Sequence, residues 1–278
     1  TRLQGDWSSD VCSSDLAQNL APEDFEVWVI DGGSCDATIQ IVKSHPLQPR
    51  LISESDRGQW DAVNKGILES RGDVICWLNS DDRYVPGSIK QALKYLSSHP
   101  DCLILYGDAD YIDEHGERIG KYAVENWSYS RLIDICYICQ PATIFKREIT
   151  NQFGLLSGQF PVAIDLDYWI RIGRNCNFQY IPVKIAESRI WHGTKSSQQQ
   201  LQMQWDALRI GYYYTGIWSA RRRLGVSSNI ARYIVPFNKS ANPPKWIGLT
   251  RTISFHIIER FTYIILTLGC WIRTLLPR

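Results

Sequence analysis

The sequence predicts an α/β fold in which strands end in polar turns that lead into helices. An apolar, strand-like run at residues 25–30 is followed by a glycine-containing turn. Ser, Asp and Thr, which are helix-capping types, come next and precede an apolar run with helical spacing. A second apolar run, residues 74–78, ends in Asn79-Ser80-Asp81-Asp82. At 278 residues with 44% hydrophobic side chains, the chain can form one such domain with an appendage.

The adjacent carboxylates of Asp81 and Asp82 indicate a cation at the end of the second strand. Two like charges side by side repel, and each loses hydration when it is buried. A divalent metal bound to a diphosphate would remove that cost, and hard oxygen ligands suit Mg²⁺ or Mn²⁺. An ordinary Asp-Asp turn at a strand end is the alternative interpretation, because Asp favours turns and helix caps.

The first strand ends at Asp31, which is followed by Gly32, Gly33 and Ser34. Ligands of open α/β sheets bind beyond the carboxyl ends of the strands. Asp31 and the Asp81–Asp82 pair are therefore expected to face one crevice. Between them in the sequence, residues 54–67 form a polar loop that leads into a helix.

Three of these segments together resemble the inverting GT-A glycosyltransferases, the nucleotide-sugar-dependent transferases of family 2. That family's pattern is an Asp-Gly-Ser-x-Asp-x-Thr turn, then Glu-x-Asp-x-Gly…Asp-Ala-x-Asn-x-Gly, then a strand ending in Leu-Asn-x-Asp-Asp. Residues 31–38, 54–66 and 78–82 match it in order and spacing. Residues 140–147 and 163–171 are similar to two later motifs. The resemblance covers residues 17–200.

The resemblance implies a GT-A (Rossmann-like), mostly parallel sheet flanked by helices over residues 16–200, with a helical C-terminal appendage over residues 201–278. Family members begin with an apolar strand, and nothing before Phe25 reads as a strand, so the first strand is expected to be missing. Ser8-Ser9-Asp10 is nearly repeated by Ser13-Ser14-Asp15. Residues 1–15 are therefore expected to be foreign or disordered sequence.

The resemblance also implies a function. The chain is expected to move a sugar from a nucleoside-diphosphate donor, of the UDP or dTDP/GDP type, to a hydroxyl of a saccharide or lipid-linked acceptor. Transfer would proceed with inversion, in the synthesis of a cell-surface polysaccharide or glycolipid. A divalent metal, Mg²⁺ or Mn²⁺, would be the cofactor.

Site residues follow from the same resemblance. Asp82 and His192 are expected to hold the metal. The expected nucleotide-binding residues are Asp31, Gly33, Ser34, Asp61, Lys65 and Asp81. Asn79, Gln140 and Trp127 are expected to contact the donor or acceptor sugar, with a core position as the alternative for Trp127.

A carboxylate is expected to remove the proton from the acceptor hydroxyl, and the resemblance points to Asp165. A carboxylate suits this role when it lies within hydrogen-bond reach of the hydroxyl. Asp167 is the alternative base. It lies two residues further along the expected helix and so projects in a different direction.

Composition narrows the range of partners. A net charge of +1 argues against nucleic acid, because proteins that bind the phosphate backbone carry a strong basic excess. Eight cysteines are scattered along the chain, some inside apparent strands, which predicts reduced thiols in a cytoplasmic protein. Cys136 and Cys139 have CxxC spacing, but the sequence has no second pair or His cluster to complete a zinc site.

The last segment, residues 253–276, is rich in apolar and aromatic side chains. Its apolar centre, residues 261–272, is shorter than the ~20 residues that span a bilayer. An amphipathic helix lying peripherally at the inner face of the membrane is expected, with nearby Arg side chains favouring anionic lipid. A helix packed on the catalytic domain or on a partner is the alternative.

Two other functions compete with sugar transfer. A sugar-nucleotide-binding module without turnover would result if the missing first strand abolishes activity. An unrelated Mg²⁺-dependent nucleotidyltransferase would also place carboxylates at strand ends. The sequence has no Gly-x-x-x-x-Gly-Lys-Ser/Thr phosphate loop, which counts against that last class.

Overall fold

A βαβ unit opens the part of the chain that the computed structural model describes, which is residues 17–234, 257 and 259–268. Strands β1 (Trp28–Asp31) and β2 (Arg50–Ser53) pair in parallel, and helix α2 (Thr38–Ser44) connects them. The Asp36 carboxylate caps α2 by accepting hydrogen bonds from the Thr38 backbone N–H and hydroxyl, at 3.0 and 2.5 Å. The expected strand-to-helix junction is thus present.

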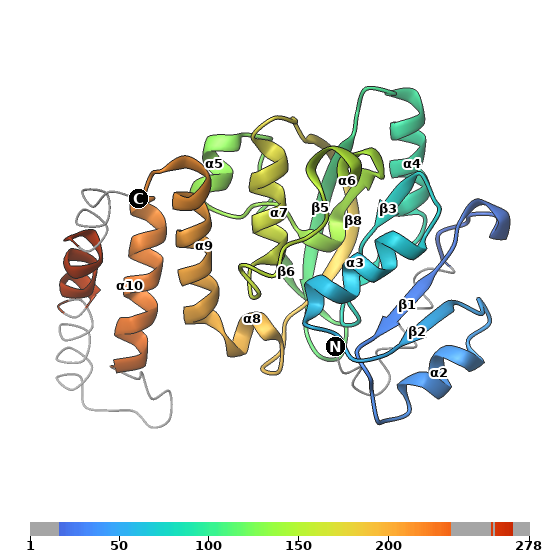
Figure 1. Cartoon of the computed structure of the whole chain (residues 1–278), viewed down its shortest axis with the longest axis horizontal. Helices are drawn as coiled ribbons and strands as arrows, with labels where there is room; N and C mark the ends of the chain where they lie inside the picture. The colour runs from blue at the N-terminus through green and yellow to red at the C-terminus, as the bar shows by residue number, and fades with distance from the viewer. Residues whose placement is uncertain (1–16, 235–256, 258, 269–278) are drawn as a thin grey trace.

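A larger sheet lies beside this unit (Figure 1). Within the described residues it has six strands in the order β3-β7-β5-β8-β4, with β6 paired to the outer part of β5. The strands are β3 (Val74–Cys76), β4 (Arg83–Tyr84), β5 (Ile104–Ile112), β6 (Arg118–Lys121), β7 (Thr143–Lys146) and β8 (Gln179–Arg189). The central strands β5 and β8 pair over more residues than any other two described strands.

The α/β class is confirmed, but the prediction of a mostly parallel sheet is wrong. Only β1–β2 and β5–β8 are parallel among the described strand pairs, and the other four pairs are antiparallel. A tight turn at residues 113–116 makes β5 and β6 an antiparallel hairpin. Parallel pairing needs a long crossover, which the helices between β5 and β8 provide. The motifs mark strand ends but not strand directions.

The two sheets are not joined by hydrogen bonds between strands in the described part of the chain. β1 ends one sheet and β3 ends the other. Helix α3 (Gln59–Glu69) covers β1, and Gly66 lets the helix approach because a Cβ there would lie 3.3 Å from Ile30. Residues 1–15, expected to be foreign or disordered, lie outside the described residues, and the missing first strand stays a prediction.

Helices cover both faces of the larger sheet (Figure 1). Helix α4 (Ser88–Ser98) packs its buried Ile89, Ala92 and Leu96 against one face. On the other face the core includes side chains from α3, α6 and α7, with the fully buried Trp169 of α7 among them. The remaining short helices are η1 (Pro22–Asp24), α5 (Tyr129–Asp134), η2 (Gln140–Ala142), α6 (Glu148–Phe153) and α7 (Ile164–Gly173).

The C-terminal part of the described chain is helical. It comprises α8 (Lys195–Gln198), α9 (Gln200–Thr215), α10 (Ala220–Ile234) and the helical residues 259–268. Helix α9 packs on α7, and Arg222 of α10 donates hydrogen bonds to the backbone carbonyls of Leu132 and Ile133. This region is therefore packed onto the α/β part. None of the described helices combines the length and apolarity that a membrane crossing requires.

Candidate active site

The turn after β1 is organised by the buried carboxylate of Asp31. Its Oδ2 accepts hydrogen bonds from the backbone N–H of Gly33 (3.1 Å) and Ser34 (2.9 Å) and from the Ser53 hydroxyl (2.7 Å), and its Oδ1 accepts from the Ser34 hydroxyl (2.5 Å). Burial acts to raise the pKa of Asp31, but these bonds outweigh it and hold the pKa below its ordinary value. Gly33 has φ of +87°, which favours glycine.

Three of these four hydrogen bonds converge on Oδ2 of Asp31 and only one reaches Oδ1. Asp31 therefore shapes the turn, while Oδ1 keeps a lone pair that can accept one further hydrogen bond. Ser34 is partly buried and Gly33 is exposed, so the backbone of this turn reaches solvent.

Helix α3 begins with a small ion network around Asp61. Arg57 donates to Asp61 Oδ1 from Nε and Nη2, at 3.1 and 2.6 Å, and Lys65 Nζ lies 3.6 Å from Asp61 Oδ2. Lys65 also forms an ion pair with Glu54 at 2.8 Å. The hydrogen bond from Arg57 is the main reason that the pKa of Asp61 is lowered. The predicted nucleotide-binding residues Asp61 and Lys65 thus lie one turn apart on the same side of α3.

Asn79, just beyond β3, connects its own segment to α3 and η2 through its side-chain amide. Its Oδ1 accepts from Gln59 Nε2 (2.7 Å) and Trp77 Nε1 (3.1 Å). Its Nδ2 donates to Gln140 Oε1 (2.8 Å) and Asp82 Oδ2 (3.2 Å). Asn79 therefore uses both its donor and acceptor groups within the protein, and it holds Asp82 against the start of α3 and η2.

Gln140 is buried and fixed at both ends of its amide. Nε2 donates to the Trp77 carbonyl at 2.5 Å, while Oε1 accepts from Asn79. The predicted sugar contacts of Asn79 and Gln140 are therefore accompanied by a structural role. Both residues align the strand end that carries Asp81 and Asp82.

Asp82 is a buried carboxylate without a cationic side chain in hydrogen-bond contact among the described residues. Oδ1 accepts from the Arg189 backbone N–H at 3.0 Å, and Oδ2 accepts from Asn79. Burial, followed by repulsion from Asp81, raises the pKa of Asp82 to about 7. Burial likewise raises the pKa of Asp81. The pair therefore carries an unfavourable charge that a cation would relieve.

Arg189, the last residue of β8, holds this strand end to a neighbouring loop. Its Nε donates to the Asp81 carbonyl at 2.9 Å, and its Nη1 donates to the carbonyls of Asp113 and Glu114 at 3.0 and 3.2 Å. Arg189 is buried, and no sequence motif had pointed to it. Arg189 lies 107 residues from Asp82, so only the fold brings them together.

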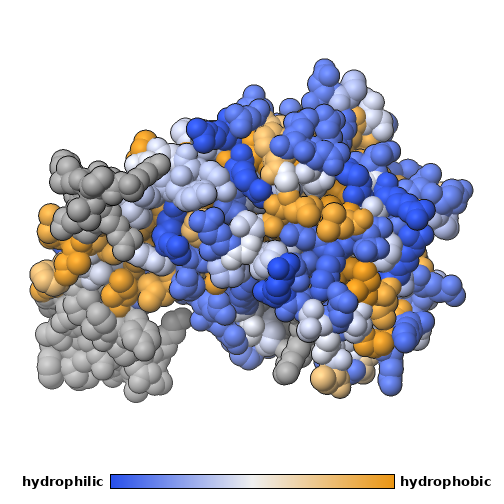
Figure 2. Space-filling view, in the orientation of Figure 1, coloured by the Kyte–Doolittle hydropathy of each residue, from blue (hydrophilic) through white to orange (hydrophobic). Residues whose placement is uncertain are grey.

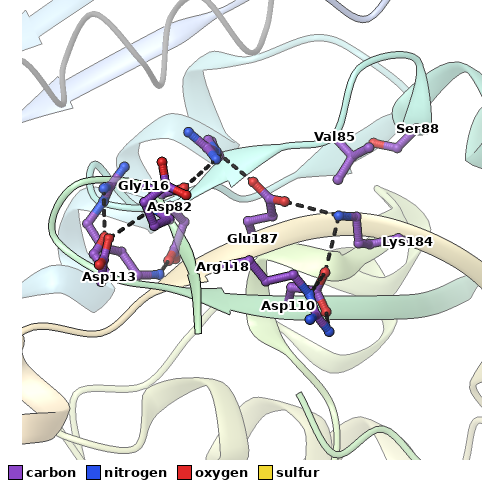
Figure 3. A network of polar contacts seen from close by, with 12 residues as sticks. Asp82, Val85, Ser88, Asp110, Asp113, Gly116, Arg118, Lys184 and Glu187 are labelled. Carbon is purple, nitrogen blue, oxygen red and sulfur yellow. Dashed lines mark hydrogen bonds and ion pairs between the residues drawn. The ribbon is translucent and has the colours of Figure 1, made fainter. Parts of the chain in front are cut away.

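A ladder of alternating charges extends from this site across the sheet (Figure 3). Glu187 pairs with Arg83 (2.6 Å) and Lys184 (3.1 Å), and Asp110 pairs with Lys184 (3.2 Å) and Arg118 (2.8 Å). The ladder links β4, β8, β5 and β6. It therefore fixes the relative positions of the strands that lead to Asp82 and Arg189.

His192 is not built into a metal cluster in the described part of the chain. Its side chain is 86% exposed, and Nδ1 lies 3.9 Å from Oε2 of Glu114, the residue whose carbonyl Arg189 binds. The described residues contain no group of three or more His, Cys, Asp or Glu side chains placed to hold a metal ion. His192 as a ligand therefore stays a prediction.

The two carboxylates of α7 have different surroundings. Asp167 is buried and accepts a hydrogen bond from the Tyr214 hydroxyl of α9 at 3.0 Å. Asp165 is only partly buried, and its backbone and that of Leu166 provide the hydrogen bonds that act on it. Burial raises the pKa of both groups. Asp167 thus ties α7 to α9, whereas Asp165 has the freer carboxylate.

Asp82 and Asp165 both lie near the thiol of Cys139. Burial is the main cause that raises the pKa of Cys139, and the charges of Asp82 and Asp165 raise it further. Cys139 immediately precedes Gln140. The structure therefore brings the end of β3, η2 and the start of α7 to one region, which joins the third, fourth and fifth sequence motifs.

Trp127 is partly buried and packs against the core, and its predicted sugar contact stays a prediction. Its ring stacks on Phe178 with centroids 4.4 Å apart and 4° between the planes, and its Nε1 donates to Asn177 at 3.0 Å. A Cβ on Gly173 of α7 would lie 2.7 Å from its ring. The alternative interpretation of Trp127 as a core residue is the one that these contacts support.

We expect Asn79→Ala to lower the free energy of unfolding by about 2–3 kcal/mol, because it leaves buried partners of the amide unsatisfied. The same change should weaken metal-dependent nucleotide binding, since Asp82 loses the hydrogen bond from Asn79 that holds its carboxylate in place. Urea unfolding and calorimetry measure the two effects. Asn126→Ala, at an exposed position, is the matched control. Equal stability of the two variants would contradict the role assigned to Asn79.

The fold and this arrangement are those of an α/β domain with a cluster of carboxylates beyond its strands, and comparison with known proteins identifies the family. The sequence profile of glycosyl transferase family 2 matches residues 11–153, so the chain belongs to that family.

Named relatives are similar over part of their length. The chain is 28% identical to chondroitin synthase of Escherichia coli over 193 residues, which are 68% of this chain and 28% of that protein. It is 27% identical over 157 residues to a PGL/p-HBAD biosynthesis glycosyltransferase of Mycobacterium bovis, covering 55% of this chain and 59% of that protein. The chain thus spans less than two thirds of either relative.

Solved structures confirm the GT-A fold. S. aureus TarS 1–349 in complex with UDP-GlcNAc aligns with a TM-score of 0.59 at 15% identity, covering 85% of this chain and 71% of that one. The mannosyltransferase PcManGT from Pyrobaculum calidifontis, in complex with GDP-Man and Mn²⁺, aligns with a TM-score of 0.60 at 15% identity. That alignment covers 99% of this chain and 85% of the other.

Proposed function

We propose that this chain transfers a glycosyl group from a nucleoside-diphosphate sugar to a hydroxyl acceptor, with inversion at the anomeric carbon. The observation that carries the proposal is the buried carboxylate of Asp82, which is adjacent to Asp81 and lies near the Cys139 thiol together with the freer carboxylate of Asp165. One side of the region suits a charged diphosphate and the other suits proton removal from a hydroxyl. Membership of glycosyl transferase family 2 supports the same reaction and argues against a nucleotidyltransferase.

The residues at the end of β3 fit a divalent cation. Asp82 is buried with a raised pKa, and its carboxylate accepts hydrogen bonds from the Arg189 backbone N–H, the Asn79 amide and the Ser188 hydroxyl. A carboxylate has about four lone-pair sites, so one remains for a cation. Mg²⁺ and Mn²⁺ accept one or two carboxylates together with substrate phosphates and water. When bound, the cation would neutralise the charge that develops on the diphosphate leaving group. Asp82 would hold it, with Asp81 in support and His192 as a further proposed ligand.

The remaining predicted residues take positions consistent with donor binding. The nucleoside would lie between the turn after β1 and helix α3. The exposed backbone of Gly33 and Ser34 would contact it from the turn, which Asp31 shapes, and Asp61 and Lys65 would contact it from α3. Asn79 and Gln140 would line the sugar side while they hold Asp82. Asp165 would take the proton from the acceptor hydroxyl.

The names of related proteins narrow the substrate classes. One structural relative was solved with UDP-GlcNAc and another with GDP-Man and Mn²⁺, and one sequence relative is a chondroitin synthase. We propose a nucleotide sugar as the donor and a growing saccharide or lipid-linked sugar as the acceptor. Such a reaction would belong to cell-surface polysaccharide or glycolipid synthesis.

A screen of nucleotide sugars by thermal unfolding tests donor binding. UDP-, GDP- and dTDP-linked sugars are each measured with Mn²⁺, with Mg²⁺ and with a chelator. We expect one nucleotide series to raise the melting temperature only when the metal is present. Hydrolysis or transfer is then followed as release of nucleoside diphosphate. Binding without release, with any acceptor, would identify a binding module without turnover, and no binding at all would overturn the proposal.

A further inference from the structure

An exposed apolar stripe runs along the C-terminal helical residues and is not needed for packing within the described chain. The stripe has exposed fractions of 62% at Ile257, 64% at Phe261, 53% at Ile264, 52% at Ile265 and 59% at Leu268. Spacings of three and four residues place these side chains on one face of a helix. Figure 2 shows apolar side chains at this edge of the molecule, beside α10.

The opposite face of the same helix is already engaged. Leu266 packs against the small core around Leu208, Trp218 and Val226. The Arg223 guanidinium lies over the Tyr263 ring, 5.7 Å from its centroid. The Ser228 hydroxyl donates a hydrogen bond to the Glu259 carboxylate. The helix is therefore anchored to α10 by one face and presents the stripe outward.

The charged side chain that the described helix exposes beside the stripe is positive. Arg260 is exposed within the stripe, whereas Glu259 is turned inward to Ser228. From residue 251 to residue 278 the sequence has four Arg, one Glu and no Asp or Lys. A second copy of this face would bring positive charge against positive charge. An anionic headgroup layer over an apolar interior complements it on both counts.

We propose that this face binds an anionic lipid surface, with the helix lying in the membrane interface and the α/β part held above it. Ile257, Phe261, Ile264, Ile265 and Leu268 enter the apolar layer, and Arg260 lies at headgroup depth. This inference stands apart from the glycosyl-transfer proposal, because it rests on the surface of the C-terminal helix and on none of the residues around Asp82.

Vesicle sedimentation of the full chain tests the inference, with phosphatidylcholine vesicles that contain or lack phosphatidylglycerol. We expect binding to the anionic vesicles that weakens with salt. The double variant Ile264→Ser/Ile265→Ser should bind about tenfold or more weakly, because two large apolar side chains are lost from the interface. Arg260→Ser should lose mainly the preference for anionic lipid. The control Leu68→Ser/Ile119→Ser changes two similarly exposed apolar residues elsewhere and should bind like the wild type.

Three results would overturn the inference. Wild-type chain that stays in the supernatant with anionic vesicles shows that the stripe does not bind lipid. Equal losses in the stripe variant and the control variant show that vesicle binding is not located at the stripe. Sedimentation velocity that finds a dimer, which Ile264→Ser/Ile265→Ser dissociates, shows that the stripe binds a second copy instead. Far-ultraviolet circular dichroism of each variant verifies that the helices persist.

Discussion

Asp82→Asn is expected to abolish the stabilisation of the protein by Mn²⁺ and nucleoside diphosphate while leaving the fold intact. The wild-type carboxylate is buried beside Asp81, so a bound cation relieves both repulsion and burial. An amide at this position keeps an acceptor for the Arg189 backbone N–H but provides no charge for the cation. Calorimetry with UDP and with GDP, each with and without Mn²⁺, measures the effect.

The same substitution is expected to change how stability depends on pH in the metal-free protein. The pKa of Asp82 is about 7 in the folded chain against an ordinary value of 3.8, so the folded state binds this proton more tightly than the unfolded state. The free energy of unfolding should therefore fall as pH rises from about 4 to about 7 and then level off. The difference between the two pKa values corresponds to at most about 4 kcal/mol.

Urea unfolding from pH 4 to pH 8, in the presence of a chelator, measures this slope. Asp82→Asn should show a shallower decline than the wild type, and Asp101→Asn, at an exposed position, should follow the wild type. Identical slopes in wild type and Asp82→Asn would show that Asp82 is ionised without cost. Undiminished Mn²⁺-dependent nucleotide binding in Asp82→Asn would remove it from the metal site.

The sequence was sufficient for the parts of the site that lie at the ends of regular elements. Apolar runs and turn residues located β1 and β3 to within a few residues, which placed Asp31 at the end of β1 and Asp82 in the turn that follows β3. The family resemblance placed Asp165 and Asp167 on a helix, and both lie in the first turn of α7. These are local features, because each depends on neighbours only a few residues away.

Long-range partners could not be read in the same way. Arg189 reaches Asp81 and Asp82 from more than 100 residues away, and Gln59 meets Asn79 only after α3 has packed beside β3. Strand direction also depends on connections between elements, which is why a mostly parallel sheet was wrong. Trp127 illustrates a third limit, since an aromatic ring stacks equally well on a sugar or on Phe178.

Apolar periodicity at the C-terminus had left two alternatives open, namely packing on the domain or contact with a membrane. The described helix shows why the pattern supports both. Leu266 and Tyr263 pack toward α10, while Phe261 and Ile265 are exposed. A helix that is apolar on two faces has no single amphipathic direction, so its sequence alone does not reveal which face meets the protein.

Asp165→Asn is expected to lower the rate of sugar transfer by about 10²–10⁴-fold while nucleotide affinity stays unchanged. Asp165 is a partly buried residue that lies near the Cys139 thiol together with Asp82, and burial of its carboxylate raises the pKa. A raised pKa makes a carboxylate a stronger base. The transfer rate of the wild type should therefore rise as the pH passes through this raised pKa. The residual rate of the variant should not show this rise.

Asp167→Asn is the matched control, since it makes the same chemical change two residues away on the same helix. Its remaining oxygen can still accept the Tyr214 hydrogen bond, so we expect a transfer rate within about tenfold of the wild type and a modest loss of stability. Steady-state kinetics, with nucleotide affinity measured separately by calorimetry, distinguishes the two variants. Transfer that survives in Asp165→Asn and disappears in Asp167→Asn would reverse the roles. Transfer that survives in both would place the base on another residue.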